Sequence, residues 1–271
     1  MARPDVSVIM PAYRAGASIA RAARSALGQR GVDVELVVCA DDEEDYGAQL
    51  RALLPRRGAL MLCRTPLPKS GPSLARNLGL MHASAEIIAC LDADDTFAPA
   101  RLRRLLPLAD TYGVATGATC EIAPGCARRI AAPRRGARRL AIEDICELRM
   151  PFPPVFHRRA GLSWPELAFA EDVILNVDLF CACGAYPFVA EAKYHYHHGK
   201  NTRSSSPDAL RQARTGYLQI LAMIAGRPWP AAVRELVDRV FHEDLARVER
   251  ALAEGADAAS WRSIVRDGAQ P

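Results

Sequence analysis

The sequence predicts an α/β protein with a mainly parallel central sheet, flanked by helices and followed by a C-terminal helical extension. Short β-like runs alternate with helical patterns through the first half of the chain, and strands joined by helices form parallel sheets covered on both faces. Half of the 271 residues are hydrophobic, which allows a substantial core. Beyond Asp208 the pattern changes to two long amphipathic segments, which predict the extension.

The elements of the first half are predicted from apolar runs of strand length that are separated by segments with helical periodicity. The expected strands span 6–10, 34–39, 60–63 and 87–91, and the expected helices span 17–27, 47–54, 73–83 and 99–110. Right-handed crossovers would place each helix against the sheet.

The second half of the chain is less regular. A β-like run at 114–122 leads into an arginine-rich loop, and a proline-rich stretch at 151–154 is not expected to form regular structure. Helices are predicted at 142–148, 171–181, 209–224 and 231–253.

Composition and cysteine placement favour a cytoplasmic protein. No signal-peptide pattern opens the chain, and no stretch is long and apolar enough to span a bilayer. Cys39, Cys63 and Cys90 lie in or beside apolar runs, where reduced thiols behave as small hydrophobes. The pairs 120/126 and 181/183 lack the spacing of zinc ribbons or redox dithiols, so structural zinc is not expected.

Six arginines lie between Arg128 and Arg139, although the net charge of the chain is only +4. No aromatic residues interrupt them, so the segment lacks a stacking platform and nucleic-acid binding is not expected. The segment is interpreted as a solvated surface loop. The alternative is a contact with anionic lipid headgroups at the inner face of a membrane, or with a phosphorylated acceptor.

An apolar run ends at Leu91 and is followed by three carboxylates, Asp92, Asp94 and Asp95. In extended chain Asp92 and Asp94 point the same way, so both can reach one hard divalent cation. Mg²⁺ or Mn²⁺ held in this way usually also binds a substrate phosphate. The alternative is an acidic turn that caps the helix beginning near Pro99.

Two further strand ends carry candidate ligand-binding residues. Pro11-Ala12-Tyr13 follow the first strand, and Asp41-Asp42 follow the second. In open α/β sheets ligands bind outside the carboxyl ends of the strands, where these residues and Asp92-Ala93-Asp94 all fall. Their convergence predicts one ligand site.

Four motifs occur in an order that resembles family 2 glycosyltransferases of the GT-A fold. They lie at 6–13, 37–42, 71–79 and 92–94. The resemblance extends over roughly residues 5–205. It implies a GT-A domain at 1–205, with a nucleotide-sugar-binding half at 1–112 and an acceptor-binding half at 113–205, and then a helical extension at 206–271.

The resemblance implies roles for the matching residues. Asp94 and Asp92 would hold Mn²⁺ or Mg²⁺, which bridges the donor diphosphate. The acidic pair after the second strand would contact the base, but Ala40 and Glu43-Glu44 depart from the family pattern. The choice within that pair, and the choice of base, therefore stay open. The implied donor-binding residues are Pro11, Ala12, Tyr13, Asp41, Asp42, Arg76, Asn77, Asp92 and Ala93.

Glu171 and Asp172 match the acidic pair of the family, whose second member is the general base, so Asp172 is the expected base. Their place in the first turn of a predicted helix favours the ionised form and weakens its basicity. The segment 194–204 resembles the family's closing region. There His198 would be a metal ligand and Lys200 and Arg203 phosphate contacts, with a solvated histidine-rich loop as the alternative.

The activity implied by the resemblance is inverting, metal-dependent transfer of a sugar from a nucleotide donor, expected to be a UDP-sugar. The acceptor would be a hydroxyl of a glycan or lipid-linked glycan in cell-surface polysaccharide synthesis. Residues 123–170 would shape the acceptor pocket. Four aromatic residues there are expected either to belong to the core or to stack on sugars: Phe152, Phe156, Trp164 and Phe169.

Three other classes share parts of this pattern. The run from Asp92 to Thr96 also fits the D-x-D-x-T motif of haloacid-dehalogenase-like phosphatases, but three strand units precede it here. A sugar nucleotidyltransferase would open with a glycine-rich basic loop, of which residues 11–16 are a poor version. A non-catalytic nucleotide-sugar-binding module would not need Asp172.

Overall fold

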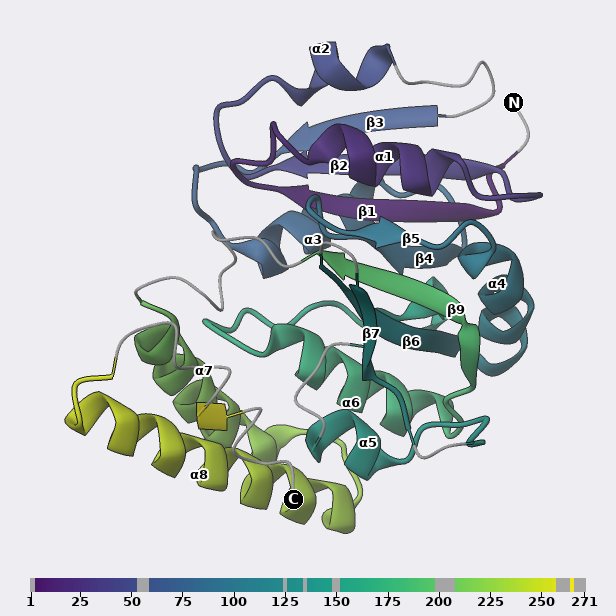
Figure 1. Cartoon of the computed structure of the whole chain (residues 1–271). Coiled ribbons are helices and arrows are strands. Elements are labelled where there is room, and N and C mark those ends of the chain that lie inside the picture. Colours follow the sequence, from purple (N-terminus) through teal and green to yellow (C-terminus); the bar gives the residue numbers. More distant parts are fainter. Residues whose placement is uncertain are drawn as a thin grey trace.

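The computed structural model describes residues 3–52, 59–123, 126–133, 136–147, 152–197, 208–256 and 264–265. They form an α/β molecule around one sheet with the strand order β3-β2-β1-β4-β8-β6-β9-β5, and β7 pairs with β6 outside this path. Helices cover the sheet, and two long helices form a further layer at one end of the molecule (Figure 1).

Four parallel strands form the first half of the sheet: β1 (Val6–Ala12), β2 (Val34–Ala40), β3 (Ala59–Arg64) and β4 (Ile87–Cys90). Every residue of β2 and β4 is buried, as expected of strands that are covered on both faces. Since β1 pairs in parallel with both β2 and β4, the carboxyl ends of these strands share one edge. The parallel sheet predicted for the first half is therefore confirmed.

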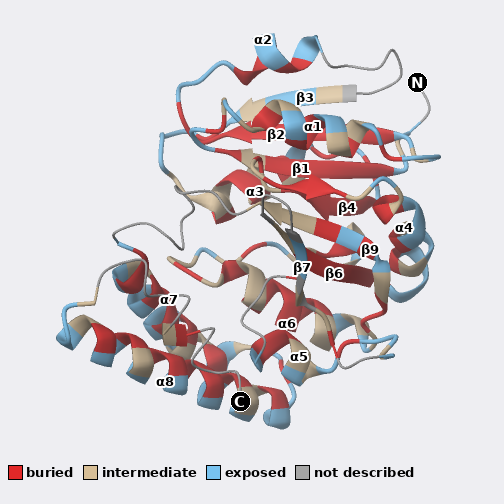
Figure 2. Cartoon of the chain, in the orientation of Figure 1, coloured by how far each residue is buried: buried red, intermediate tan, exposed pale blue. Residues whose placement is uncertain are grey.

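Successive residues of the strands face two separate cores. Val8 packs with helices α1 (Ile19–Leu27) and α4 (Arg101–Tyr112) on one face, and α2 (Tyr46–Arg51) adds to the same core. Ile9 packs with α3 (Pro72–His82) on the other face. The approach of α3 is so close that a side chain at Gly79 would collide with Ile9 and Cys39. Figure 2 shows the buried residues gathered along the strands and the inward helix faces.

The sheet becomes mixed beyond β4. Strand β8 (Val155–His157) is antiparallel to both β4 and β6 (Val114–Ala123), and β6 is parallel to β9 (Phe188–His197). Strands β5 (Thr96–Phe97) and β7 (Cys126–Ala131) add antiparallel pairs to β9 and β6. Backbones of β6 and β9 come so close that a Cβ atom at Gly117 would lie 1.9 Å from the carbonyl oxygen of Ala192.

These later strands correct the sequence predictions. The arginine-rich segment is predicted to be a loop, but its first residues belong to β7, where Arg128 bonds Glu121 of β6 at 3.2 Å. Pairing with β6 satisfies the backbone there, so the local arginine content does not prevent a strand. The prediction also misses β5, β8 and β9. The proline-rich stretch is irregular at 152–154, as expected, but β8 begins directly after it.

The remaining helices contribute to the same hydrophobic core as α3, on the other face of the sheet from α1. They are α5 (Ile142–Glu147), α6 (Glu171–Cys183), α7 (Ala209–Met223) and α8 (Ala231–Ala253). Asp178 of α6 accepts hydrogen bonds from Trp229 Nε1 at 2.7 Å and Arg227 Nη1 at 3.2 Å, both in the link between α7 and α8. Tyr217 and Val240 belong to the same hydrophobic cluster as α6.

Two further sequence expectations concern cysteines and the membrane. Cys39 and Cys90 are buried in the core, and the cysteines that the structure describes are free thiols. Within the described ranges, none of the helices combines the length and apolar character needed to cross a bilayer.

Candidate functional site

The loop after β1 forms one side of the site. Asp41 donates its backbone N–H to the carbonyl of Ala12 at 2.7 Å, which ties the ends of β1 and β2 together. The Tyr13 ring is 42% exposed, and the Arg14 guanidinium lies 5.3 Å from its centre. Arg14 adopts a left-handed conformation with φ of 50°. Tyr13 is therefore partly exposed at the carboxyl edge of the sheet, and its contact with a nucleotide donor stays a prediction.

Asp41 organises the segment that leads into α3. Its carboxylate accepts hydrogen bonds from the backbone N–H groups of Ser70 at 2.8 Å and Gly71 at 2.9 Å, and from Thr65 Oγ1 at 2.8 Å. The side chain is 5% exposed. These bonds give Asp41 a structural role, and a contact with a nucleotide base stays a prediction.

Asp42, which follows Asp41 at the same edge of the sheet, is likewise bonded within the protein. It accepts hydrogen bonds from the Tyr46 hydroxyl at 2.7 Å, from the Glu44 N–H at 3.1 Å and from the Arg14 N–H. It therefore holds the loop after β1 against the loop after β2. Both predicted base-binding carboxylates thus lie at the expected edge, and each is already bonded within the protein.

The acidic cluster follows β4. The Asp92 side chain is 43% exposed, Asp94 is partly buried and Asp95 is buried. Burial raises the pKa of Asp94 to about 6, and the charge of Asp92 adds to this shift. Asp95 accepts the backbone N–H of His197 at 2.8 Å, which joins the cluster to the end of β9.

The cluster has the donor chemistry of a divalent metal site. Carboxylate oxygens suit Mg²⁺ and Mn²⁺. Burial is the main cause of the raised pKa of Asp94, and a cation would relieve the repulsion from Asp92 that adds to it. Among the residues that the structure describes, no three His, Cys, Asp or Glu side chains form a metal-binding group. Mg²⁺ commonly binds one or two carboxylates together with water and substrate phosphates, so Asp92 and Asp94 fit such an ion.

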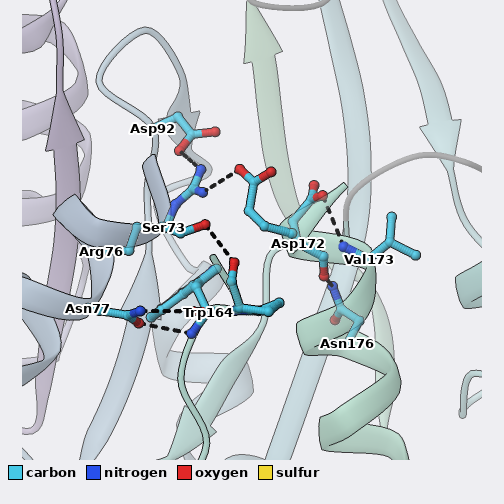
Figure 3. A network of polar contacts seen from close by, with 10 residues as sticks. Ser73, Arg76, Asn77, Asp92, Trp164, Asp172, Val173 and Asn176 are labelled. Atoms are coloured by element: carbon cyan, nitrogen blue, oxygen red, sulfur yellow. Dashed lines mark hydrogen bonds and ion pairs between the residues drawn. The ribbon is translucent and has the colours of Figure 1, made fainter. Parts of the chain in front are cut away.

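Arg76 connects the acidic cluster to the second acidic pair. This buried guanidinium donates from Nη2 to Asp92 Oδ1 at 2.8 Å and from Nη1 to Glu171 Oε1 at 3.0 Å (Figure 3). Burial alone would lower the pKa of Arg76, but the charges of Asp92 and Glu171 outweigh it and raise that pKa. Arg76 is therefore a fixed positive charge between Asp92 and Glu171, which are 79 positions apart in the sequence.

Asp172 lies in the first turn of α6, beside Glu171. Its Oδ1 accepts the Val173 N–H at 2.9 Å, and its carbonyl accepts Asn176 Nδ2 at 2.8 Å (Figure 3). Burial raises the pKa of Asp172 to about 6, and the charge of Glu171 adds to the shift. The helix N-terminus is predicted to favour the charged form, but burial outweighs that effect. The result is a carboxylate that is ionised at neutral pH and more basic than an ordinary aspartate.

The residue that precedes this pair is strained. Ala170 has φ of 62°, a left-handed conformation that costs a residue with a Cβ about 1–2 kcal/mol. Such strain is common at functional sites because the surrounding structure holds it in place.

Several predicted residues take other positions. Asn77 bonds the backbone of Trp164, and its contact with the nucleotide stays a prediction. The four candidate sugar-stacking aromatics, Phe152, Phe156, Trp164 and Phe169, are all buried in the core. His198, Lys200 and Arg203 lie outside the described residues.

Sequence reasoning did not predict the hydrogen bonds that join α3 to the segment before α6. Ser73, Trp164 and Pro165 link α3 to the segment before α6. The i, i+3, i+4 spacing of Ser73, Arg76 and Asn77 on one helix face was a usable signal. The partners of Ser73 and Asn77 are backbone groups, which leave no trace in the sequence.

The fold is that of the GT-A glycosyltransferases, and comparison with solved structures agrees. The Staphylococcus aureus protein TarS, residues 1–349 in complex with UDP-GlcNAc, superposes with a TM-score of 0.68 at 18% identity, over 91% of this chain and 72% of that TarS fragment. The mannosyltransferase PcManGT from Pyrobaculum calidifontis, in complex with GDP-Man and Mn²⁺, superposes with a TM-score of 0.64 at 18% identity, over 99% of this chain and 80% of PcManGT. At these identities the likeness concerns the fold.

The chain belongs to glycosyl transferase family 2, whose profile matches residues 7–155, more than half of its length. Succinoglycan biosynthesis protein ExoO of Rhizobium meliloti (strain 1021) is 43% identical over 112 residues, 41% of this chain and 31% of ExoO. The Escherichia coli glucosyltransferase WfgD, which acts on α-D-GlcNAc-diphosphoundecaprenol with UDP-Glc, is 38% identical over 90 residues, 33% of this chain and 35% of WfgD. The matches thus span about a third of these relatives. Family membership leaves the phosphatase and nucleotidyltransferase alternatives without support.

Proposed function

We propose that this protein is an inverting, metal-dependent glycosyltransferase that moves a sugar from a nucleotide donor, a UDP-sugar in the first instance, to a hydroxyl of a glycan or lipid-linked glycan. The pathway would be cell-surface polysaccharide synthesis in the cytoplasm, with the acceptor at the inner face of a membrane. Support comes from relatives named for succinoglycan biosynthesis and for transfer to a diphosphoundecaprenol-linked sugar.

The observation that carries the proposal is the bridge formed by Arg76. It holds Asp92, beside the candidate metal carboxylate Asp94, and Glu171, beside the candidate base Asp172. A glycosyl transfer needs a charge-neutralising group at the leaving diphosphate and a base at the attacking hydroxyl. The bridge brings residues suited to each task into one constellation.

The residues would divide the chemistry as follows. Asp94 and Asp92 would hold Mn²⁺ or Mg²⁺, which neutralises the diphosphate and so makes it a better leaving group. Asp172 accepts the proton of the acceptor hydroxyl while that oxygen forms a bond to the anomeric carbon. The bond between that carbon and the diphosphate oxygen breaks, and the electron pair leaves with the diphosphate. Attack on the face opposite the leaving group inverts the anomeric centre.

A donor screen tests the proposal. Thermal unfolding would be followed with UDP-sugars and GDP-mannose, each with and without Mn²⁺. A donor that binds the folded state at 100 times its Kd stabilises it by about 2.7 kcal/mol, so a clear rise of the midpoint is expected. The rise should require the metal and should be lost in Asp94→Asn.

The matched control is Asp110→Asn, at the far end of α4, which should respond as the wild type does. Release of nucleoside diphosphate with an acceptor then separates a transferase from a binding module. Absence of a shift with every donor, or a shift that is the same in Asp94→Asn, would overturn the proposal.

A further inference from the structure

One face of α3 contacts both sides of the candidate site. Ser73, Arg76 and Asn77 lie on that face because they are spaced i, i+3 and i+4. Arg76 bonds side chains on both sides, whereas Ser73 and Asn77 bond the backbone of the segment that leads into α6 (Figure 3). This segment, residues 164–170, is called the base-approach segment below.

Asn77 holds the start of the base-approach segment with two bonds to one residue. Its Nδ2 donates to the Trp164 carbonyl at 2.8 Å, and its Oδ1 accepts the Trp164 N–H at 2.9 Å. One turn earlier, Ser73 Oγ donates to the Pro165 carbonyl at 2.8 Å. A primary amide suits this position because it offers a donor and an acceptor side by side.

The far side of the base-approach segment is fixed by α7. Gln219 accepts the Ala168 N–H at 2.8 Å. A Cβ atom at Gly216 would lie 2.6 Å from the Phe169 nitrogen, so the two backbones are in direct contact. The segment is thus held between α3 and α7, and it ends at the strained Ala170, immediately before Glu171 and Asp172.

We propose that Asn77, assisted by Ser73, is a positioning residue that sets the place of Asp172 relative to Asp92 by fixing the base-approach segment on α3. The inference rests on the proposed function, in which Asp172 is the base. It gives Asn77 a role different from the nucleotide contact implied by the family resemblance. Misplacing a reactive group by about 1 Å can cost about 10²-fold in rate, so loss of the contact between Asn77 and the base-approach segment should lower kcat.

The test compares Asn77→Ala with Ser84→Ala. Ser84 also makes side-chain hydrogen bonds, to Glu35 at 2.9 Å, but it lies just before β4, at the opposite edge of the sheet from the site. Three quantities would be measured: hydrogen exchange of peptides covering 162–175, the Kd of UDP and of GDP with MnCl₂, and kcat with donor KM.

For Asn77→Ala we expect faster exchange in those peptides, because the Trp164 N–H loses its acceptor. The nucleotide Kd and the donor KM should stay within about twofold, while kcat falls by about tenfold or more. Asn77→Asp keeps the acceptor and loses the donor, so its kcat should lie between those of the wild type and Asn77→Ala. Ser84→Ala should leave hydrogen exchange at 162–175 and kcat at the wild-type level, even if its melting temperature falls as much as that of Asn77→Ala.

Two results would overturn the inference: unchanged exchange at 162–175 in Asn77→Ala, or a fall in nucleotide affinity of about tenfold with kcat preserved. Ser73→Ala removes one bond and serves if Asn77→Ala does not fold. Failure of the proposed function is recognised separately, since the wild type would then either bind neither nucleotide or release no nucleoside diphosphate in the presence of an acceptor. In that case the exchange comparison still decides whether Asn77 fixes the base-approach segment.

Discussion

Adjacent residues Glu171 and Asp172 differ in what surrounds their carboxylates. Glu171 is bound by the buried guanidinium of Arg76 at 3.0 Å. Asp172 instead accepts an N–H of its own helix, and burial raises its pKa to about 6. A base works best when its pKa is close to the working pH, so Asp172 is better suited than Glu171 to take a proton.

The raised pKa of Asp172 predicts a pH dependence of kcat. Below about pH 6 the carboxyl is protonated and cannot accept a proton, so kcat should fall about tenfold for each pH unit there and level off above. Asp172→Asn should lower kcat by about 10²- to 10⁴-fold and remove this acidic limb. Steady-state rates from about pH 5 to 8 would check both.

The matched control for this profile is Asp178→Asn, which removes another carboxylate of α6 that is also raised in pKa by burial. It faces Trp229 rather than the site, so the acidic limb should persist. An acidic limb that survives in Asp172→Asn would assign the titration to a different group.

The sequence located the charged members of the site, and the structure explains why it could not locate the rest. Asp92 is predicted from the carboxylates that follow an apolar run, whereas Arg76 and Glu171 are implied by the family resemblance. The structure brings these three together. The resemblance also implies a role for Asn77, but its bonds to the backbone of Trp164, 87 residues away, could not be predicted, because any residue there offers the same groups.

At the level of secondary structure, the strands predicted best were those with a mainly apolar run of strand length. Strands β1 to β4 are continuous apolar runs, so each was expected within a few residues of its bounds. The bounds of α8 are predicted at both ends. Strand β9 was missed although Ala192 and Tyr194 alternate with less buried residues, which is a period-two signal. Strands β5 and β8 have two and three residues, too few to carry a pattern.

Gly117 makes a testable contribution to the pairing of β6 with β9. A Cβ atom there would lie 1.9 Å from the Ala192 carbonyl oxygen, which neither strand can accommodate without moving. Gly117→Ala should therefore lower the free energy of unfolding by about 1–3 kcal/mol or more. Urea unfolding followed by circular dichroism would measure it.

Gly226→Ala is the matched control, because nothing lies within 4 Å of a Cβ atom at that position. It should leave stability unchanged or raise it by about 0.4–1 kcal/mol, since alanine restricts the unfolded chain. Equal stabilities of the two variants would contradict the close approach of the strands.

At the scale of the whole molecule, α7 and α8 share a core with the helix that carries the candidate base. Tyr217 and Val240 belong to the same hydrophobic cluster as Leu175 of α6, and Asp178 joins α6 to Trp229 at 2.7 Å. We therefore propose that α7 and α8 unfold together with the GT-A part of the chain. A helical extension with a core of its own would unfold separately.

Replacing Trp229 tests this coupling. Trp229→Phe keeps an aromatic ring but removes the N–H that Asp178 accepts, so unfolding should be easier by about 1.5–3 kcal/mol, the value of a hydrogen bond to a charged group. Calorimetry should show one transition in both proteins, at a lower temperature in the variant. Two transitions in the wild type would contradict the coupling.

The bonds already made by Asp41 have a consequence for the choice of nucleobase. A carboxylate offers about four acceptor positions, and Ser70, Gly71 and Thr65 occupy three of those of Asp41. As the predicted base contact, Asp41 would then accept a single imino hydrogen, which uracil and guanine carry on their pairing edge. Cytosine and adenine present a bare ring nitrogen in that place, which the carboxylate would repel. We therefore expect uridine and guanosine diphosphates to protect the protein against heating, and cytidine diphosphate to leave it unprotected.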